Sequence, residues 1–590
     1  MLYSEVAAAY QTMEDTPKRL ELTELFADLI AKTPHELVDK VIYLTQGKLY
    51  PDFMGIEVGL AEKMCMRAIA AKSGQSLKEV EKNHHLFGDI GLVAEDFLKN
   101  KGQITLFSEP LTVERIYDVL DSIARASGPG SMELRLRLLN GLLADASPKE
   151  AKYILRTATG KLRLGIADYT VLDALAVAFT NDKGNRPTIE RAYNLSGDLG
   201  LVARTLVLKG LKGVEKFRIK FGHPVRPMLA ERLDSAKAIL EKMGGIAALE
   251  YKLDGERVQI SYGSSKFWIF SRRLETITNQ YPDLVDLSKS SLKGKEYVIE
   301  GEVVAIDVDT DAYLPFQELM HRRRKHGVAK AVDEYPVSIN FFDLLFLDGK
   351  DLTGLPYQKR RNQLENIVKD NARVNVIPSK VVTTVDEIEE FMASAIADGC
   401  EGLVVKDLKS VYRAGAREFA WIKLKREYSG ELTDSLDLVV VGAFHGRGRR
   451  KGKYGAFLLA SYDPVNNDFR TVCKVGTGFS DENLIKFFNI LVPIKIPNKP
   501  NNVVSKIDAD VWFNPQIVIE VMGSEITLSS VHTVAMDTVR KGNGLALRFP
   551  KFMGRIRSDK GVSDSTSNTE LLKMYKRQKK LISKHSDNTH

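Results

Sequence analysis

Apolar positions in the first third of the chain recur at helical spacing. In residues 20–26 and 116–120 they repeat three and four positions apart, so they line one face of an amphipathic helix. Few strand-like stretches interrupt this pattern before residue 220. We therefore predict an all-α domain over residues 1–220.

The pattern changes after residues 223–230, which contain two helix-breaking prolines and are typical of a linker into a new domain. Apolar runs at 297–305 and 338–345 predict strands, and residues 383–398 predict a helix. This mixture indicates an α+β domain over residues 221–429.

Beyond residue 430, short β-rich segments alternate with glycine-rich turns. Five of them lie at residues 438–444, 455–462, 470–475, 517–521 and 545–549. Five short strands favour a small closed barrel, and the oligonucleotide-binding (OB) fold is the commonest nucleic-acid-binding candidate. We predict a β-barrel OB-fold domain over residues 430–590, so the chain is multidomain.

Composition agrees with several soluble domains inside the cell. The chain has 590 residues, of which 44% are hydrophobic and 27% charged, as in ordinary globular proteins. No apolar run approaches the roughly 20 residues of a membrane span, and the N-terminus lacks a signal-peptide pattern. The three scattered cysteines, Cys65, Cys400 and Cys473, exclude a cysteine-built zinc site and fit a reducing compartment. We expect a cytoplasmic protein.

Positive charge is concentrated at the C-terminal end. The chain has 85 Lys and Arg against 77 Asp and Glu, net +8; residues 541–590 alone have 12 against 4, also +8. A basic end on a neutral body indicates contact with a polyanion, either nucleic acid or nucleotide phosphates. The alternative, for residues 573–584, is a solvated basic tail.

The sequence Lys-Leu-Asp-Gly-Glu-Arg at residues 252–257 carries candidate chemistry. Its flanks predict two strands joined by a tight Asp-Gly turn, with Lys252 at the mouth of the hairpin. A lysine amine becomes a nucleophile when nearby cations or an apolar pocket lower its pKa. The alternative is a charged hairpin tip without chemistry.

Charged residues also interrupt apolar strands further on. Glu300 and Glu302 share one strand face, Glu401 precedes an apolar strand, and Lys423 and Lys425 share another face. Like charges on one face repel unless opposite charge lies between them. A nucleoside triphosphate with a divalent cation supplies both signs, whereas each pair alone fits an exposed sheet edge.

Seven motifs in order resemble the motif series of ATP-dependent DNA ligases, most closely the archaeal type related to the eukaryotic replicative enzymes. They lie at residues 252–257, 271–273, 299–302, 342–345, 401–406, 421–425 and 555–560. The resemblance implies a helical DNA-binding domain at 1–220, a nucleotidyltransferase (adenylation) domain at 221–429, and an OB-fold domain with a basic tail at 430–590.

The resemblance also implies a three-step reaction. Lys252 attacks the α-phosphate of ATP, releases pyrophosphate and keeps AMP through a phosphoramidate bond. AMP then passes to the 5′-phosphate of a nick in double-stranded DNA, and the 3′-hydroxyl displaces it. Mg²⁺ or another divalent cation assists. The implied setting is DNA replication, repair and recombination by a nucleoid-associated monomer.

Roles in nucleotide binding follow from the resemblance. It implies that Glu250 recognises the adenine amino group and that Phe342 stacks on the ring, although Phe342 also fits a core position. Arg257 and Arg272 would contact phosphate or ribose oxygens. Arg417 would be a further contact to the nucleotide.

The remaining nucleotide contacts are carboxylate and lysine side chains. Glu302 and Glu401 are the implied metal or ribose partners, and Lys423 and Lys425 the implied α-phosphate contacts. Lys406 would support these residues without contacting the nucleotide itself.

The last motif supplies Arg557, Asp559 and Lys560, which in this family swing over ATP and orient pyrophosphate. That role requires the barrel to close onto the middle domain and then reopen for DNA.

Two segments carry the expected DNA contacts. Residues 159–166 resemble the segment with which the helical domain grips the duplex, through Lys161 and Arg163; without the resemblance they are a glycine-bounded turn. The glycine-rich loop at 445–453 offers cations for DNA phosphates, and such contacts make affinity fall with salt. The cations we assign to DNA in this loop are Arg447, Arg449 and Arg450.

Residues 103–107, from Gln103 to Phe107, partly resemble the segment with which related archaeal ligases hold a sliding clamp. An exposed Leu-Phe pair could equally pack into its own domain.

Rival functions share parts of this pattern. An RNA ligase or an mRNA-capping guanylyltransferase has the lysine motif and most of the middle domain, but the helical first domain favours a DNA ligase. An NAD-dependent ligase is disfavoured because its four-cysteine zinc site cannot be built from three cysteines. A non-catalytic nucleic-acid-binding scaffold explains the basic barrel but not the acids and lysines that accompany Lys252.

Overall fold

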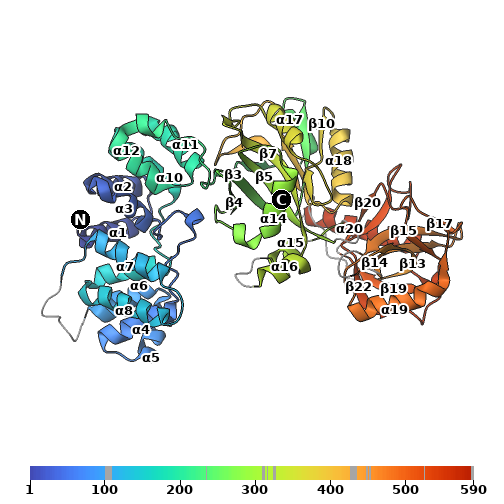
Figure 1. Ribbon diagram of the computed structural model, residues 1–590, viewed down its shortest axis with the longest axis horizontal. Coiled ribbons are helices and arrows are strands. Elements are labelled where there is room, and N and C mark those ends of the chain that lie inside the picture. The colour runs from blue at the N-terminus through green and yellow to red at the C-terminus, as the bar shows by residue number, and fades with distance from the viewer. Residues whose placement is uncertain are drawn as a thin grey trace. The chain divides into compact units, whose positions relative to one another are not determined.

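The computed structural model divides into two compact units (Figure 1). Unit 1 comprises Met1–Pro227 with Phe270–Thr276, and unit 2 comprises Met228–Ile269 with Ile277–His590. The structure describes residues 1–99, 109–233, 235–307, 312–314, 316–322, 327–425, 435–446, 450, 453–523 and 525–586, with side chains described up to residue 577 of the last helix and not for residue 317.

Unit 1 is helical, which confirms the all-α prediction for this region. In its described part, the α-helices are α1 (Tyr3–Glu14), α2 (Arg19–Lys32), α3 (Val38–Thr45), α4 (Glu62–Ser73), α5 (Leu77–Phe87), α6 (Ile90–Leu98), α7 (Val113–Arg125), α8 (Ser131–Asp145), α9 (Pro148–Ala158), α10 (Asp168–Thr180), α11 (Arg186–Ser196) and α12 (Leu199–Val214). The expected apolar stripes at 20–26 and 116–120 fall in α2 and α7, and both helices bury one face in a single core.

Helix α9 lies inside this core, because every one of its residues from Glu150 to Ala158 is buried. Its first turn has a capping box between Ser147 and Glu150 that satisfies the exposed backbone N–H groups. Its buried cation Arg156 pairs with Asp89 at 3.0 Å and with Glu14 at 2.9 Å. These pairs compensate the burial of charge, which would otherwise be costly.

The middle region of unit 2 contains two sheets, which confirms the α+β prediction. The five-stranded sheet has the order β1-β12-β11-β2-β10, and the seven-stranded sheet has the order β4-β3-β5-β7-β8 with β6 and β9 at its sides. Their strands are β1 (Leu229–Arg232), β2 (Ala247–Lys252), β3 (Glu256–Gly263), β4 (Lys266–Ser271), β5 (Tyr297–Asp307), β6 (Ala312–Tyr313), β7 (Val337–Leu347), β8 (Lys350–Asp351), β9 (Val374–Val376), β10 (Ser379–Val382), β11 (Gly402–Lys406) and β12 (Arg417–Lys425).

Helices accompany both sheets. Helix α17 packs on β7, and α18 packs on β2, β10 and β11 (Figure 1). The predicted helix at 383–398 is α18, which begins after a Thr384–Glu387 capping box. The helices of this region are α13 (Ala236–Lys242), α14 (Pro282–Ser291), α15 (Phe316–Met320), α16 (Val328–Glu334), α17 (Tyr357–Ile367) and α18 (Val385–Ala397).

The predicted hairpin at Lys252 is wrong. Strand β2 pairs with β10 and β11, whereas β3 pairs with β5 in the other sheet, so the chain crosses between sheets at residues 253–255. Gly255 is needed there for close approach rather than for a turn: a Cβ at Gly255 would lie 2.3 Å from the carbonyl oxygen of Val303. An Asp-Gly pair permits a hairpin turn, but it does not determine which strand becomes the partner.

The C-terminal region is β-rich, and all five predicted strands are present as β13, β14, β15, β19 and β21. Strand β21, however, forms a separate two-stranded sheet with β20, while the others belong to an eight-stranded sheet. This mostly antiparallel architecture, in which β15 and β17 form a parallel pair, fits the predicted OB-type barrel. Its elements are β13 (Leu436–His445), β14 (Tyr454–Asp463), β15 (Asp468–Val475), α19 (Asp481–Leu491), β16 (Lys495–Ile496), β17 (Val503–Val504), β18 (Val511–Phe513), β19 (Val518–Met522), β20 (Glu525–Ser529), β21 (Gly544–Arg548), β22 (Lys551–Ile556) and α20 (Asn568–Ser586).

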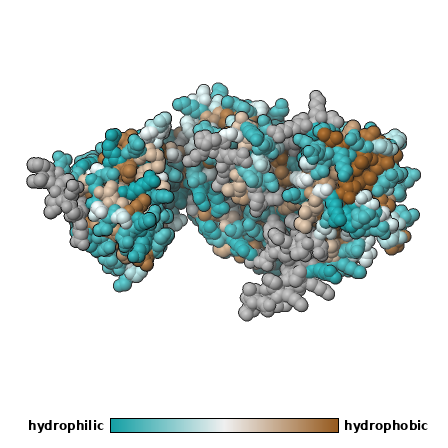
Figure 2. All heavy atoms as spheres, turned by 90° about the horizontal axis from the view of Figure 1, so that it is seen from below, coloured by the Kyte–Doolittle hydropathy of each residue, from teal (hydrophilic) through white to brown (hydrophobic). Residues whose placement is uncertain are grey.

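The basic tail begins as part of the fold. Within α20, Leu571 and Tyr575 are one turn apart and buried in the core of the C-terminal region. The start of residues 573–584 is therefore a helix packed on one face, while its cations Lys573, Lys576 and Arg577 are exposed. Figure 2 shows a mostly hydrophilic surface, with hydrophobic side chains gathered mainly at the right-hand end of that view. Among the described residues, no helix is long and apolar enough to cross a membrane.

Candidate nucleotide-binding site

The five-stranded sheet gathers the predicted lysines on one face. Lys252 of β2 lies opposite Gly402 of β11, which in turn lies opposite Lys425 of β12. Two residues further along the sheet, Glu250 and Lys423 lie in another common row. Residues in such rows project to the same side, so the face is charged. The alternate positions are apolar and face α18.

Glu401 links the two lysines nearest the start of β11. Its Oε2 accepts hydrogen bonds from Lys252 Nζ and, at 2.8 Å, from Lys425 Nζ. Its backbone N–H donates to the carbonyl oxygen of Lys252 at 2.8 Å. Burial alone would raise the pKa of Glu401, but the charge of Lys252 and the hydrogen bonds from both lysines lower this pKa to about 2. Glu401 is therefore a stable anion beside the candidate nucleophile.

Asp254 brings a second carboxyl group to this point. Burial first, and then a hydrogen bond and charge repulsion from Glu401, raise the pKa of Asp254. Two carboxyl groups that repel each other are a suitable partial ligand set for a divalent cation, because hard oxygen ligands and positive charge relieve the repulsion. Among the described residues, no group of three or more His, Cys, Asp or Glu could hold a metal alone. Phosphate oxygens would have to complete such a site.

Glu302 lies close to the same crossing. Its Cγ would be 2.9 Å from a Cβ on Gly255, and its backbone pairs with Arg257. Of the two predicted metal ligands, Glu401 thus contacts Lys252 directly, and Glu302 lies beside the segment that follows Lys252.

Glu250 is held in a buried network. Its carboxylate accepts hydrogen bonds from Tyr357 at 2.6 Å and Arg361 at 3.3 Å, and it pairs with Lys406 at 2.6 Å. Burial lowers the pKa of Lys406, while Glu250 opposes this shift. The network holds the Glu250 side chain in place. Its carboxylate can only accept hydrogen bonds, as is needed to bind an exocyclic amino group.

Phe342 lies beside this network, on strand β7. Phe341 points into the core of the seven-stranded sheet, and Phe342, one residue on, points away from it towards Trp421 at a ring distance of 6.2 Å. Lys406 Nζ lies 4.3 Å from the ring of Trp421 and 5.0 Å from that of Phe342. Only 8% of Phe342 is exposed, so it satisfies the core alternative while lying beside the charged face.

Arg257 is anchored by residues that the sequence analysis did not assign. Its guanidinium donates to Glu300 at 2.8 Å and to the carbonyl oxygen of Met228 at 2.7 Å. Tyr412 donates a hydrogen bond of 2.8 Å to the same Glu300 oxygen. Glu300 was visible as half of an acidic pair, but nothing local in the sequence shows that it is the partner of Arg257. Tyr412 lies 155 residues from Arg257, and no motif in the sequence marks it as part of this site.

One predicted nucleotide contact, Arg417, is not brought to Lys252. Arg417 begins β12, whereas Lys425 ends it, so about 26 Å of extended strand separates them. Arg272 belongs to the segment Phe270–Thr276, which clusters with unit 1, and its side chain is exposed.

The last motif is held within the C-terminal region. Arg557 Nη1 and Lys560 Nζ both bind Oδ2 of Asp437 at 2.7 Å. Arg557 also binds Asp559, its neighbour in the motif, at 2.8 Å.

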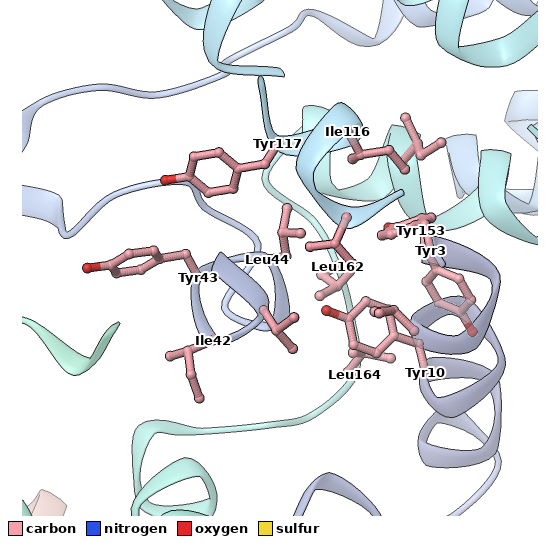
Figure 3. Close-up of a cluster of buried hydrophobic side chains, with 14 of the residues drawn as sticks. Tyr3, Tyr10, Ile42, Tyr43, Leu44, Ile116, Tyr117, Tyr153, Leu162 and Leu164 are labelled. Atoms are coloured by element: carbon pink, nitrogen blue, oxygen red, sulfur yellow. The ribbon is translucent and has the colours of Figure 1, made fainter. Parts of the chain in front are cut away.

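The segment at residues 159–166, which the sequence predicts to bind DNA, alternates buried and exposed residues. Leu162 and Leu164 enter the helical core (Figure 3), while Lys161 and Arg163 keep about half of their side chains exposed. Each cation is paired with an acid of unit 1; the pairs are Lys161 with Glu62 at 2.8 Å and Arg163 with Asp89 at 3.2 Å.

The glycine-rich loop at 445–453 is described only in part. Arg447 and Arg449 lie outside the described residues, as do residues 103–107. Arg450 donates to the carbonyl oxygens of Gly455 at 2.8 Å and Gly476 at 2.9 Å. These bonds give Arg450 a role in holding the loop, which the prediction of a DNA phosphate contact did not include.

Three protein-family models match the chain in order. Residues 2–176 match "DNA ligase N terminus", residues 227–425 match "ATP dependent DNA ligase domain", and residues 450–560 match "ATP dependent DNA ligase C terminal region". The "DNA ligase 2" of Thermofilum pendens is 51% identical over 588 residues, covering 98% of each chain. The "DNA ligase" of Cenarchaeum symbiosum is 48% identical over 582 residues, covering 99% of each.

The chain belongs to the ATP-dependent DNA ligase family, archaeal type. This confirms the resemblance inferred from the seven ordered motifs. The ligase is an enzyme that uses ATP and joins DNA at nicks, which decides against an RNA ligase, a capping enzyme or a scaffold. A solved structure, the ligase domain of M. tuberculosis LigD, is 25% identical, covers 57% of this chain and 97% of its own, and has a TM-score of 0.27.

Proposed function

We propose that the ligase captures AMP on Lys252 Nζ, passes it to the 5′-phosphate of a nick, and seals the nick by attack of the 3′-hydroxyl. The observation that carries this proposal is the row of Lys252, Gly402 and Lys425, with Glu401 bound to both lysines. Gly402 has no side chain, so the row brings the two amines to the same carboxylate, that of Glu401. That arrangement suits a phosphate flanked by a nucleophile and a cation.

Lys252 must lose a proton before it attacks phosphorus. Glu401, with its pKa of about 2, is too weak a base to keep that proton near neutral pH. The residues that would hold a divalent cation are Glu401 and Asp254, with Glu302 beside them, and the cation would neutralise phosphate charge. Glu401, held by a cation in that way, would no longer neutralise Lys252, and the proton of the Lys252 amine would pass to solvent. Lys425 and Lys423 remain to bind the α-phosphate.

The nucleotide itself would be held by groups already ordered. Glu250 would accept a hydrogen bond from the adenine amino group, and Phe342 would stack on the base. Arg257, fixed by Glu300, would contact ribose or phosphate oxygens. Because these groups are preorganised, little rearrangement is needed when the phosphates arrive. Arg272, Arg417, Arg557 and Lys560 complete the proposed set of nucleotide contacts.

We also propose which residues of the ligase contact DNA and a sliding clamp, and where its domains begin and end. Lys161 and Arg163, with Arg447, Arg449 and Arg450, would bind the DNA backbone, and residues 103–107 would bind a sliding clamp. We take the domains as 1–220, 221–429 and 430–590, the metal as Mg²⁺, and the ligase as a cytoplasmic, nucleoid-associated monomer.

Labelling with α-³²P nucleotides tests the proposal. The purified ligase should become labelled with ATP and Mg²⁺ but not with GTP, and Lys252→Ala should remain unlabelled although folded. A nicked DNA duplex should be sealed, and the same nick in RNA should not. Label from GTP, label on Lys252→Ala, or no label on the wild type would each overturn the proposal.

A further inference from the structure

Two of the three cations of the last motif, Arg557 and Lys560, converge on one carboxylate group. Arg557 Nη1 and Lys560 Nζ both lie 2.7 Å from Oδ2 of Asp437. Asp437 belongs to β13, which precedes the motif by 120 residues, and only 12% of its side chain is exposed. The charges of Arg557 and Lys560 are therefore partly neutralised by a distant residue of the same region.

Arg557 has little donor capacity left in this arrangement. Its Nε and Nη2 donate to the two oxygens of Asp559 at 3.0 and 2.8 Å, while Nη1 donates to Asp437. All three guanidinium nitrogens thus bind carboxylates. Before this side chain can bind phosphate oxygens in a bidentate manner, some of these bonds must break.

Asp437 itself is fixed to the backbone around it. Its N–H donates to Thr566 Oγ1 at 3.0 Å, and its carbonyl oxygen accepts from the Thr566 N–H at 2.8 Å. The Ser461 hydroxyl in turn donates to the Thr566 carbonyl oxygen at 2.6 Å. The Arg557 N–H likewise donates to the Val518 carbonyl oxygen at 2.8 Å, so Asp437 and Arg557 stay in the same region when the barrel moves. The side chains of Arg557 and Lys560 must therefore leave Asp437, and both ion pairs must break, before these cations can contact phosphates.

Breaking both pairs has a cost that a triphosphate can offset. The other carboxylate oxygen of Asp437, Oδ1, is buried and has no hydrogen-bond partner in the described part of the chain. Without the two cations, this buried carboxylate would lose its compensating charge. A triphosphate carries several negative charges and attracts the same two cations, so the phosphates and Asp437 compete for them.

We propose that Asp437 is a positioning residue. It keeps Arg557 and Lys560 in ion pairs until the phosphates of ATP compete with its carboxylate for these two cations. This inference rests on the proposed function, in which both cations contact ATP. Its consequence is selective: Asp437 slows the capture of AMP by Lys252 at low ATP, whereas it does not affect sealing of a nick that already carries AMP.

Single-turnover kinetics with Asp437→Asn tests this proposal. The variant removes the charge and keeps the shape, so we expect labelling of Lys252 at subsaturating ATP to be about three- to tenfold faster than in the wild type. The apparent KM for ATP should fall by a similar factor. Sealing of a pre-adenylated nick should change less than twofold. Asp437→Glu keeps the charge and should show no gain in labelling.

Asp463→Asn is the matched control. Asp463 is a buried carboxylate of the same region and pairs with Arg470 at 3.2 Å, so both reactions should proceed as in the wild type. Should Asp437→Asn fail to fold, Asp437→Ser, a second neutral variant, carries the same expectation. A folded neutral variant that is labelled at the wild-type rate or more slowly overturns the inference. A wild type that is not labelled at all overturns the proposed function instead.

Discussion

Lys252 and Glu401 form an ion pair at the point where β2 and β11 meet, and Glu401 N–H also donates to the Lys252 carbonyl oxygen at 2.8 Å. The candidate nucleophile is therefore bound twice to the residue that also binds Lys425. Because Glu401 has a pKa of about 2, its carboxylate is charged at every pH at which the enzyme would work. Substrate binding must therefore rearrange the pair before chemistry begins.

Replacing Glu401 by Gln should abolish most AMP capture. The substitution removes the anion that we assign to the divalent cation and leaves Lys252 and Lys425 as unneutralised neighbours, so we expect labelling to fall by about 100-fold or more. The concentration of Mg²⁺ for half-maximal labelling should rise. Glu418→Gln, at an exposed site on β12 paired with Arg413 at 3.3 Å, is the control. Labelling of Glu401→Gln at the wild-type rate would exclude this role.

Asp254→Asn should stabilise the protein while it impairs catalysis. The pKa of Asp254 is raised in the fold, so its charged form disfavours folding above the ordinary pKa of an aspartate, and the penalty disappears when acid protonates the group. At pH 7 we expect a gain in unfolding free energy of at most about 1 kcal/mol, limited by solvent screening. Urea titrations at pH 7 and pH 3 measure it. An equal gain at both pH values would contradict this explanation.

Gly255→Ala should disturb the crossing between the two sheets. A Cβ there would lie 2.3 Å from the carbonyl oxygen of Val303, which requires a backbone shift and costs roughly 1–3 kcal/mol. Gly354→Ala is the matched control in unit 2, because a Cβ at Gly354 meets no atom within 4 Å. Thermal unfolding followed by circular dichroism compares the two, and equal melting temperatures would refute the close-approach argument.

Glu250→Gln should weaken the preference for ATP over GTP. The carboxylate can only accept hydrogen bonds, so it suits the adenine amino group and repels the guanine carbonyl, whereas an amide can serve both. We expect the ratio of labelling efficiencies to fall about tenfold. Glu365, which shares Arg361 with Glu250 through a 2.7 Å bond, provides the control Glu365→Gln. An unchanged ratio in Glu250→Gln would remove Glu250 from base recognition.

Lys161→Ala and Arg163→Ala should each weaken binding of nicked DNA regardless of its sequence. Each lost phosphate contact lowers the slope of log K against log salt by about 0.9. The loss in affinity should be modest, because both cations must first leave Glu62 and Asp89. Fluorescence anisotropy over a salt series gives the slope, with Lys32→Ala as the control at an exposed pair on α2. A slope that stays constant would show that this segment does not contact phosphate.

The sequence predicted the positions of helices and strands better than it predicted which strands pair with each other. The helical stripes of α2 and α7, the strands β5 and β7 and the helix α18 follow from local periodicity, which is visible in a short window. The partner of a strand is a long-range property, and for that reason the Asp-Gly pair after Lys252 was misread as a hairpin. A close approach such as that of Gly255 to β5 has no local signature.

The same division applies to the site. Lys252, Glu401 and Lys425 could be predicted because each stands in a short motif whose order is distinctive. The residues that hold the site were not predictable: Tyr357 binds Glu250 across 107 residues and Asp437 binds Arg557 across 120. Such pairs depend on packing between distant segments, and a single sequence contains no periodic or local trace of them.

The most direct test of this account is to locate the covalent AMP. After incubation with ATP and Mg²⁺, proteolysis and mass spectrometry should find one AMP on the peptide that contains Lys252, attached through an acid-labile bond to its Nζ. AMP on any other residue, or none under conditions in which the protein seals nicks, would contradict the central claim that Lys252 is the nucleophile.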